Sequence, residues 1–176
     1  MDSIKCFKIG LESELIKEGK NVNEEVKELP EILGDTIFIP ALKATTKEEV
    51  LAELSDTLVE RGAISNQSRD AIFKALQDRE EKMSTGMQYG IAIPHAKSDL
   101  VSSLITVVAI SPSGVDFDSL DGDVSTIFVA TLSPTADTNS HIKFLAEVSR
   151  NLSSKKVREK LLSASNLDEM KSAICG

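Results

Sequence analysis

Apolar positions recur at the spacing of an amphipathic helix in three stretches of the chain. The first stretch follows the capping-box sequence Thr46-Lys-Glu-Glu49 and ends at Gly62. The second begins near Ser65, and its apolar stripe leads to Arg79 at the next i+3 step; the stripe comprises Ala71, Ile72, Ala75 and Leu76. The third begins at His141 and shares one face with Phe144, Leu145, Val148 and Leu152. We therefore predict three helices, with Arg79 near the end of the second and His141 in the first turn of the third, both on the inward-facing side.

Runs of β-branched and other apolar residues lie between these helices and predict strands. The predicted strands are Thr36–Ile39, Ile91–Ile93, Leu104–Ile110 and Thr126–Leu132. Pro94 ends the second of them, and Pro112-Ser-Gly114 and Asp121-Gly122 provide turns. A polar loop is expected over 134–140, and short helices over 155–162 and 167–174 complete the chain. The mixture of strands and helices favours an α/β sandwich.

The length of 176 residues fits one domain. We assign residues 35–176 to it and treat residues 1–34, with their scattered apolar positions and weak helical pattern, as an N-terminal extension of unknown role. The net charge of −8, the 4% aromatic content and the absence of Trp argue against a surface for binding nucleic acid. An acidic surface favours instead a partner with a basic docking face.

No segment of the sequence indicates a membrane span or an export signal. The longest apolar run, Leu104–Ile110, has the length of a strand, and the N-terminus lacks an apolar core. Cys6 and Cys175 lie near opposite ends of the chain without the spacing of metal ligands. We therefore expect a cytoplasmic protein with reduced thiols and no direct contact with the membrane.

The chain has two histidines, and one of them follows a predicted strand in the sequence Gly90-Ile-Ala-Ile-Pro-His-Ala-Lys97. Pro94 lacks an amide proton and has a fixed φ, so it is expected to end the strand and to present His95 at its tip. Strand ends are where ligand chemistry gathers in α/β folds. The alternative for His95 is a surface-loop histidine without a chemical role.

His141 and Arg79 are the other candidate residues. A helix N-terminus offers free amide donors to a phosphate, and its dipole lowers the pKa of an imidazole there, which keeps His141 neutral. The guanidinium of Arg79 is a fork of donors that suits phosphoryl oxygens. The alternatives are a core histidine at 141 and a surface salt bridge of Arg79 within Asp78-Arg-Glu80. Two histidines and an arginine are sufficient to accept a phosphoryl group on a ring nitrogen and to transfer it.

The motifs together resemble a known family. Arg79-Glu80, Ser84-Thr-Gly86, the segment Gly90–Lys97, Leu120-Asp-Gly122 and His141-Ile-Lys-Phe-Leu-Ala146 are similar to the fructose/mannitol-type (type 2) enzyme IIA component of the bacterial phosphoenolpyruvate-dependent sugar phosphotransferase system (PTS). That family includes the nitrogen-regulatory IIA proteins. The resemblance covers about residues 35–176 and implies a single-domain sandwich whose mixed sheet of about five strands is flanked by helices.

The resemblance also implies roles for the candidate residues. His95 corresponds to the phosphoryl acceptor, which forms a tele-phosphohistidine intermediate, and His141 and Arg79 correspond to the catalytic residues around the phosphoryl group. Some members have an acidic residue just before the Gly-Ile-Ala-Ile-Pro-His motif, where this chain has Tyr89. Any role of that carboxylate is therefore not transferred to this chain.

The resulting hypothesis is a phosphoryl carrier. An HPr-type phosphocarrier is the expected donor and a IIB component, itself linked to a membrane IIC, is the expected acceptor. Nothing in the motif requires a metal or another cofactor. One alternative is a nitrogen-regulatory-type IIA protein whose phosphorylation state controls regulatory partners. A second alternative, a metal-dependent hydrolase using His95 and His141, has no obvious third and fourth ligand at fixed spacing.

Overall fold

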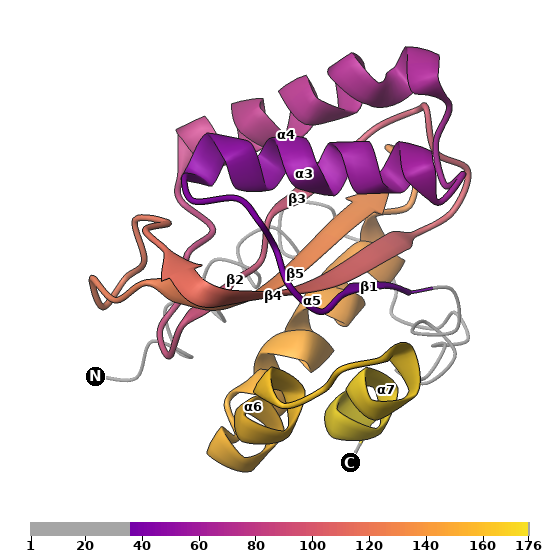
Figure 1. The fold of residues 1–176 in the computed structure, drawn as a ribbon. Helices are drawn as coiled ribbons and strands as arrows, with labels where there is room; N and C mark the ends of the chain where they lie inside the picture. The colour runs from indigo at the N-terminus through magenta and orange to yellow at the C-terminus, as the bar shows by residue number, and fades with distance from the viewer. Residues whose placement is uncertain (1–35, 176) are drawn as a thin grey trace.

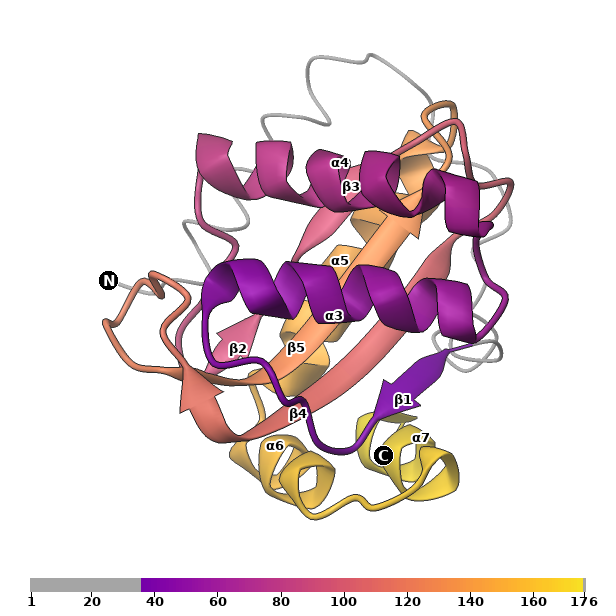
Figure 2. The ribbon, with the colours of Figure 1, turned by 45° about the horizontal axis from the view of Figure 1, so that its top comes forward.

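The computed structural model describes residues 36–175, in which one mixed sheet lies between two layers of helices (Figures 1 and 2). The strands are β1 (Ile37–Ile39), β2 (Ile91–Ala92), β3 (His95–Lys97), β4 (Ile105–Val115) and β5 (Ser125–Ser133). The helices are α3 (Lys47–Glu60), α4 (Arg69–Lys82), α5 (Thr138–Leu152), α6 (Lys155–Leu162) and α7 (Leu167–Cys175), with a 3-10 turn, η1, over Asn66–Ser68. The predicted α/β sandwich with a mixed, five-stranded sheet is confirmed.

The long strands β4 and β5 form the antiparallel centre of the sheet, and the shorter strands flank them in parallel. β1 pairs with β4 on one side. On the other side β2 and β3 occupy the same edge of β5 one after the other, with Ile91 opposite Ile127 and His95 opposite Thr131. β2 and β3 thus form one edge of the sheet, and the pairing with β5 is interrupted between them.

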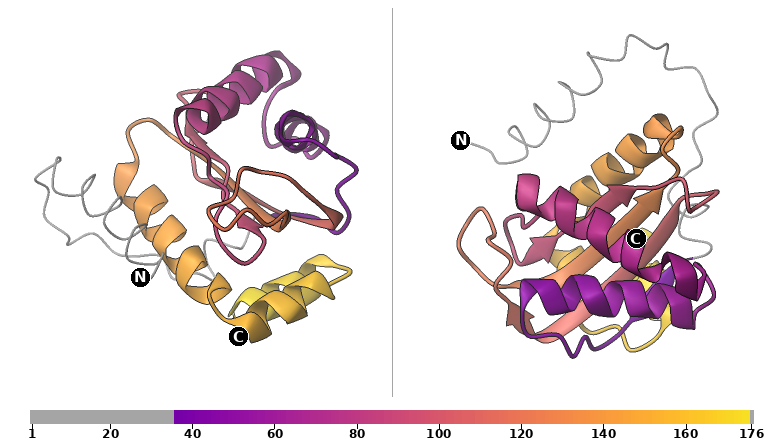
Figure 3. Two further views of the ribbon diagram at one scale, coloured as in Figure 1. Left: turned by 90° about the vertical axis from the view of Figure 1, so that its left-hand side faces the viewer. Right: turned by 90° about the horizontal axis from the view of Figure 1, so that it is seen from above.

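The helices divide between the two faces of the sheet, α3 and α4 on one and α5, α6 and α7 on the other (Figure 3). The alternation of side chains along β5 supplies both cores, because Phe128 packs toward α3 and α4 while its neighbour Val129 packs toward the other layer. The two cores are apolar over most of their extent, with Leu54, Leu58 and Leu76 fully or nearly fully buried in the first.

The first helix of the described chain begins at the predicted capping box. The backbone amide of Glu49 donates to the Thr46 hydroxyl over 3.2 Å, and the Glu49 carboxylate accepts from the Thr46 amide over 3.1 Å. Two of the amides left free at the helix start are satisfied in this way. The helix stops before Gly62, which has a φ of 69° that a residue with a side chain rarely adopts.

Several element boundaries differ from those predicted. The second helix begins at Arg69, after η1, and continues to Lys82, and the third begins at Thr138, so residues 138–140 are helical instead of looped. Pro112–Gly114 does not separate two strands: β4 continues through it by means of an irregularity between Ile110 and Val115. The weak helical pattern predicted over residues 1–34 lies outside the described residues.

Candidate active site around His95 and Arg79

His95 is the first residue of β3, and this differs in part from the prediction. Pro94 does interrupt the edge strand, since a proline has no amide to donate to β5. Pairing nevertheless resumes at once: the Pro94 carbonyl accepts from the Thr131 amide over 2.9 Å, and His95 follows in register with Thr131. The histidine therefore starts a new strand instead of lying on a loop, and its backbone is held by the sheet.

The two ring nitrogens of His95 have different partners. Nδ1 lies 2.8 Å from the carbonyl oxygen of Ile93, and Nε2 lies 3.1 Å from Nε of Arg79. A carbonyl oxygen can only accept and the Nε–H of arginine can only donate, so Nδ1 carries the proton and Nε2 carries the lone pair. The site thus selects one tautomer of a neutral imidazole, with the proton on Nδ1 and the lone pair of Nε2 directed at Arg79.

The surroundings lower the pKa of His95 to about 4. Burial of the ring is the main cause, and the positive charge of Arg79 acts in the same direction. The hydrogen bond to Ile93 and the carboxylate of Glu80 oppose the shift without reversing it. At neutral pH the ring is therefore uncharged.

Arg79 reaches His95 from the last turn of α4, where it was predicted, and its guanidinium has a second anchor. Its Nη1 donates to the carbonyl oxygen of Met83 over 2.9 Å. The predicted apolar stripe is only partly correct, because Ala71 is exposed and the buried side chains of α4 are Ile72, Leu76 and Glu80. Arg79 flanks this buried stripe, half-buried itself, and this position allows it to extend toward the edge of the sheet.

His141 lies in the first turn of α5, as predicted, and its side chain is outside the described residues. The backbone places that turn at the end of the sheet where β3 ends. α5 follows β5 closely in the chain, and β5 runs parallel to β3, so the carboxyl ends of both strands lie at the same end of the sheet. The role of His141 at this site stays a prediction.

The remaining motifs shape the loops beside Arg79. Ser84 Oγ donates to the Phe117 carbonyl over 2.7 Å, and a Cβ on Gly86 would lie only 2.6 Å from that same oxygen. The loop 83–86 therefore packs closely against the turn at 117–119, and only glycine fits at position 86. In the motif Leu120-Asp-Gly122, the Asp121 carboxylate accepts from the amide of Tyr89 over 2.9 Å and holds that residue at a φ of 67°.

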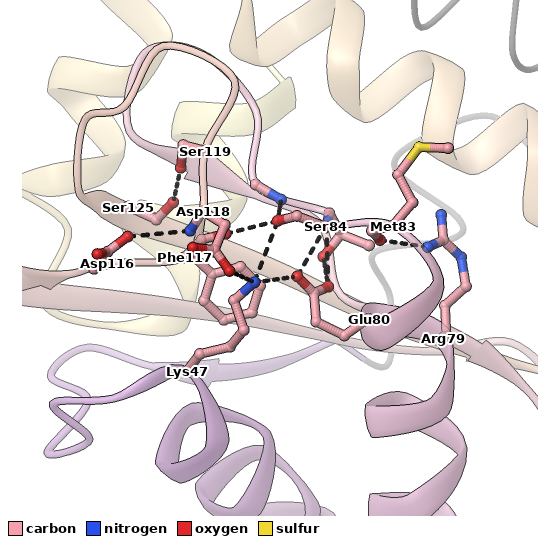
Figure 4. Close-up of polar contacts among 12 residues, drawn as sticks. Lys47, Arg79, Glu80, Met83, Ser84, Asp116, Phe117, Asp118, Ser119 and Ser125 are labelled. Atoms are coloured by element: carbon pink, nitrogen blue, oxygen red, sulfur yellow. Dashed lines mark hydrogen bonds and ion pairs between the residues drawn. The ribbon is translucent and has the colours of Figure 1, made fainter.

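Lys47, Glu80 and Thr85 were not predicted as functional residues, although Glu80 and Thr85 lie within two of the family motifs. The Glu80 carboxylate accepts from Lys47 Nζ over 2.8 Å and from both the amide and the hydroxyl of Thr85, immediately beside Arg79 (Figure 4). A signal for Glu80 was present, because it stands at i+4 from Leu76 and at i+8 from Ile72, on the buried stripe of α4. Nothing in the sequence pairs it with Lys47.

Two further findings concern residues 36–175 only. No group of three or more His, Cys, Asp or Glu is arranged to hold a metal ion among the described side chains, which do not include those of residues 138–141 and 175. No helix within the same range is long and apolar enough to cross a membrane.

Comparison with known proteins identifies the family. The family model described as "Phosphoenolpyruvate-dependent sugar phosphotransferase system, EIIA 2" matches residues 31–175. The chain belongs to this family. The resemblance drawn from the motifs is thus confirmed, and the type 2 IIA domain includes all of the described sheet and helices.

Relatives come from both branches of this IIA family. The fructose-specific EIIA component of the PTS from Haloferax volcanii is 40% identical over 119 residues, which cover 68% of this chain and 76% of the relative. The nitrogen regulatory protein of Bradyrhizobium diazoefficiens is 29% identical over 133 residues, which cover 76% of this chain and 85% of the relative.

Solved structures of IIA proteins have the same fold. The nitrogen regulatory protein IIA-Ntr from Neisseria meningitidis superposes with a TM-score of 0.72 at 26% identity, over 83% of this chain and 98% of that one. The enzyme IIA mannitol subunit in a complex with phosphorylated enzyme IIB mannitol from Escherichia coli gives a TM-score of 0.65 at 25% identity, over 79% and 94% of the two chains. The α/β architecture is therefore that of PTS IIA proteins.

Proposed function

We propose that this PTS IIA protein is a phosphoryl carrier that accepts phosphate on Nε2 of His95 from an HPr-type donor and transfers it to a IIB component. The observation that carries the proposal is the pair of contacts to the ring. The Ile93 carbonyl accepts a hydrogen bond from Nδ1–H, and the lone pair of Nε2 accepts one from the guanidinium of Arg79. Phosphorylation at Nε2 gives the tele-phosphohistidine predicted from the sequence.

The transfer requires no redox partner and no net change in protons. The lone pair of Nε2 forms a bond to phosphorus while the bond between phosphorus and the donor's histidine breaks, and the departing electron pair stays on the donor ring. The proton remains on Nδ1, and its hydrogen bond to the Ile93 carbonyl stabilises the positive charge that develops on the ring. Because the pKa of His95 is lowered to about 4, the attacking ring is neutral at the start.

Arg79 supplies the positive field for the transferred group. Its Nε–H occupies the direction of the Nε2 lone pair at 3.1 Å, so an arriving phosphoryl group meets the guanidinium first. The same donors can turn from the ring nitrogen to phosphoryl oxygens, where a planar fork makes two bonds at once. His141 at the start of α5 is assigned the complementary role of donating to another phosphoryl oxygen.

Sugar uptake of the fructose or mannitol type is the favoured function. The fructose-specific relative is 40% identical to this chain, whereas the nitrogen regulatory protein is 29% identical. The IIB acceptor is supported by the E. coli mannitol complex, in which a IIA protein of this fold is bound to phosphorylated IIB. The regulatory alternative is supported by the superposition on IIA-Ntr. The two are distinguished by adding a fructose-type IIB protein to the phosphorylated chain: rapid loss of phosphate supports uptake, and retention supports regulation.

The central assignment is tested with enzyme I, HPr and phosphoenolpyruvate. The wild-type protein should gain one acid-labile phosphate on the peptide that spans 91–97, and His95→Ala should gain none. Cleavage and mass measurement locate the group, and its stability in alkali with lability in acid identifies a phosphohistidine. Phosphate on serine or threonine, or undiminished labelling of His95→Ala, contradicts the proposal.

A further inference from the structure

The carboxylate of Glu80 is surrounded by hydrogen-bond donors. Its side chain is 4% exposed, and it accepts from Lys47 Nζ over 2.8 Å, from the Thr85 amide over 3.1 and 3.0 Å, and from the Thr85 hydroxyl over 2.5 Å (Figure 4). Every one of these neighbours donates. An ionised carboxylate is the one common side-chain group that can accept all of these bonds without presenting a hydrogen of its own.

Stability alone gives a weak reason for such a pair. Glu80 loses nearly all contact with water, which carries a large free-energy cost, while the Lys47 side chain stays 25% exposed. Buried ion pairs replaced by well-packed apolar residues often leave proteins equally or more stable. Glu80 also interrupts the apolar stripe of Ile72 and Leu76 on α4. We therefore look for the role of this buried charge in the parts of the chain that it connects.

Lys47 and Glu80 join four separate parts of the chain. Lys47 opens α3, Glu80 lies in the last turn of α4, Thr85 belongs to the following loop, and Asp118, bound by Lys47 Nζ over 2.8 Å, belongs to the turn after β4. Lys47 Nζ also lies 4.8 Å from the centre of the Phe117 ring. The pair thus fixes the loop that leaves α4 against the other parts.

That loop carries the second anchor of Arg79. The Met83 carbonyl accepts from Nη1 of Arg79 over 2.9 Å, while Thr85, two residues further along, is bound to Glu80. Ser84 between them donates to the Phe117 carbonyl and lies 3.4 Å from Lys47 Nζ. The position of the Met83 oxygen, and with it the orientation of the guanidinium on His95, depends on these bonds.

We propose that Glu80, neutralised by Lys47, is a positioning residue for phosphoryl transfer: it holds the loop 83–86 so that Arg79 stays aimed at Nε2 of His95. Glu80 does not touch the reacting atoms and acts through Arg79. This inference rests on the proposed function of His95 as the phosphoryl acceptor.

The first test is Glu80→Gln. In either orientation the amide places its NH₂ against Lys47 Nζ or against the Thr85 amide, neither of which can accept; only the Thr85 hydroxyl can reverse its bond. The loop should then shift, and transfer from phosphorylated HPr should lose at least about tenfold in kcat, the range for one misplaced transition-state donor. KM for phosphorylated HPr should stay within about twofold, since the docking surface is unchanged.

A second measurement needs no phosphate. In the wild-type protein the Nε–H of Arg79, bonded to His95, should give a slowly exchanging NMR signal, and Glu80→Gln should lose that protection. Lys74→Met is the matched control, because it breaks the exposed Lys74–Asp78 ion pair of 2.8 Å on the same helix without reaching the loop. This control should keep wild-type kcat and the protected Arg79 signal.

A third variant separates positioning from folding. Lys47→Met/Glu80→Met removes both charges together, so it should regain the stability that Glu80→Gln loses, but it cannot bind the Thr85 amide. We expect it to transfer phosphate as slowly as Glu80→Gln.

Wild-type kcat in a stably folded Glu80→Gln or in the double variant overturns the proposal. So does a change confined to KM with the Arg79 signal retained. A wild-type protein that takes up no phosphate instead refutes the proposed function, and the NMR comparison still decides the positioning.

Discussion

Arg79 donates its Nε–H to Nε2 of His95 over 3.1 Å. The lone pair of Nε2 therefore faces a positively charged group, and under the proposed function this is the nitrogen that attacks phosphorus. The guanidinium lowers the affinity of the ring for a proton, but a phosphoryl group brings oxygens that the guanidinium binds. The same arginine therefore disfavours protonation of the ring and, under the proposed function, would bind the oxygens of a phosphoryl group on Nε2.

Arg79→Lys tests this double role. Lysine retains the positive charge but has neither the fork nor the Nε–H that rests on His95. We expect phosphoryl transfer to slow by about tenfold or more, as for the loss of one transition-state contact, with little change in thermal stability. Stopped-flow or quench kinetics with phosphorylated HPr, together with a melting curve, measure both. Wild-type rates would contradict the role, and a large drop in Tm would show that Arg79 is mainly structural.

The second prediction concerns the protonation of His95. Its pKa of about 4 lies well below the 6.5 of a free histidine, so the ring should titrate by NMR with a midpoint near 4. The rate at which the protein accepts phosphate should therefore not decrease around pH 6.5 through protonation of this ring. A midpoint near 6.5 would mean that burial and Arg79 do not act on the ring as the structure indicates.

The same shift makes folding stability depend on pH. The unfolded chain binds a proton at His95 near pH 6.5, and the folded chain does so only near pH 4. The free energy of unfolding therefore has its full value above pH 6.5 and decreases as the pH falls from 6.5 to 4. At pH 5 the loss is about 2 kcal/mol. Urea unfolding at pH 7 and pH 5 should show this extra loss in the wild type relative to His95→Gln, and equal losses in the two proteins would contradict it.

The sequence predicted the fold well where patterns are local. The capping box at Thr46, the helical face of Phe144 and Leu145, and the β-branched run in β5 each depend on neighbours within one element, and each was found as predicted. The strand β3 was missed because it has only three residues and follows a proline. Its pairing is set by β5, more than thirty residues later.

The candidate site divides in the same way. His95 and Arg79 were named from the sequence, and the structure brings them into contact. Lys47 and Glu80 were missed because the bond between them spans 33 positions and joins two helices whose crossing no local pattern specifies. A carboxylate on a buried stripe was visible in the sequence. The identity of its partner required the tertiary structure.

Gly86→Ala probes the contact between the two loops beside the site. A Cβ there would lie 2.6 Å from the Phe117 carbonyl oxygen and 2.9 Å from Cα of Ser119, both backbone atoms that cannot move aside cheaply. We expect a loss of about 2 kcal/mol or more in unfolding free energy, as for overpacking in a closed space. Gly122→Ala is the control, since its φ of 78° is strained but nothing lies within 4 Å of the new Cβ. Wild-type stability of Gly86→Ala would show that the close approach of the loops is unimportant.

His141→Ala tests the remaining residue of the predicted constellation. The first turn of α5 has free amides and a positive dipole end, so a phosphoryl group on His95 near this turn gains donors even without the imidazole. The variant should therefore still take up phosphate on His95. It should pass the group to a IIB protein more slowly, because the donor that stabilises the phosphoryl oxygens during transfer is missing.

Peptide mapping should find phosphate at 91–97 in both proteins, and the discharge rate is followed after IIB is added. Phosphate shared equally between the two histidines in the wild type would contradict this division of roles. Discharge of His141→Ala at the wild-type rate would assign position 141 to the core of α5 instead.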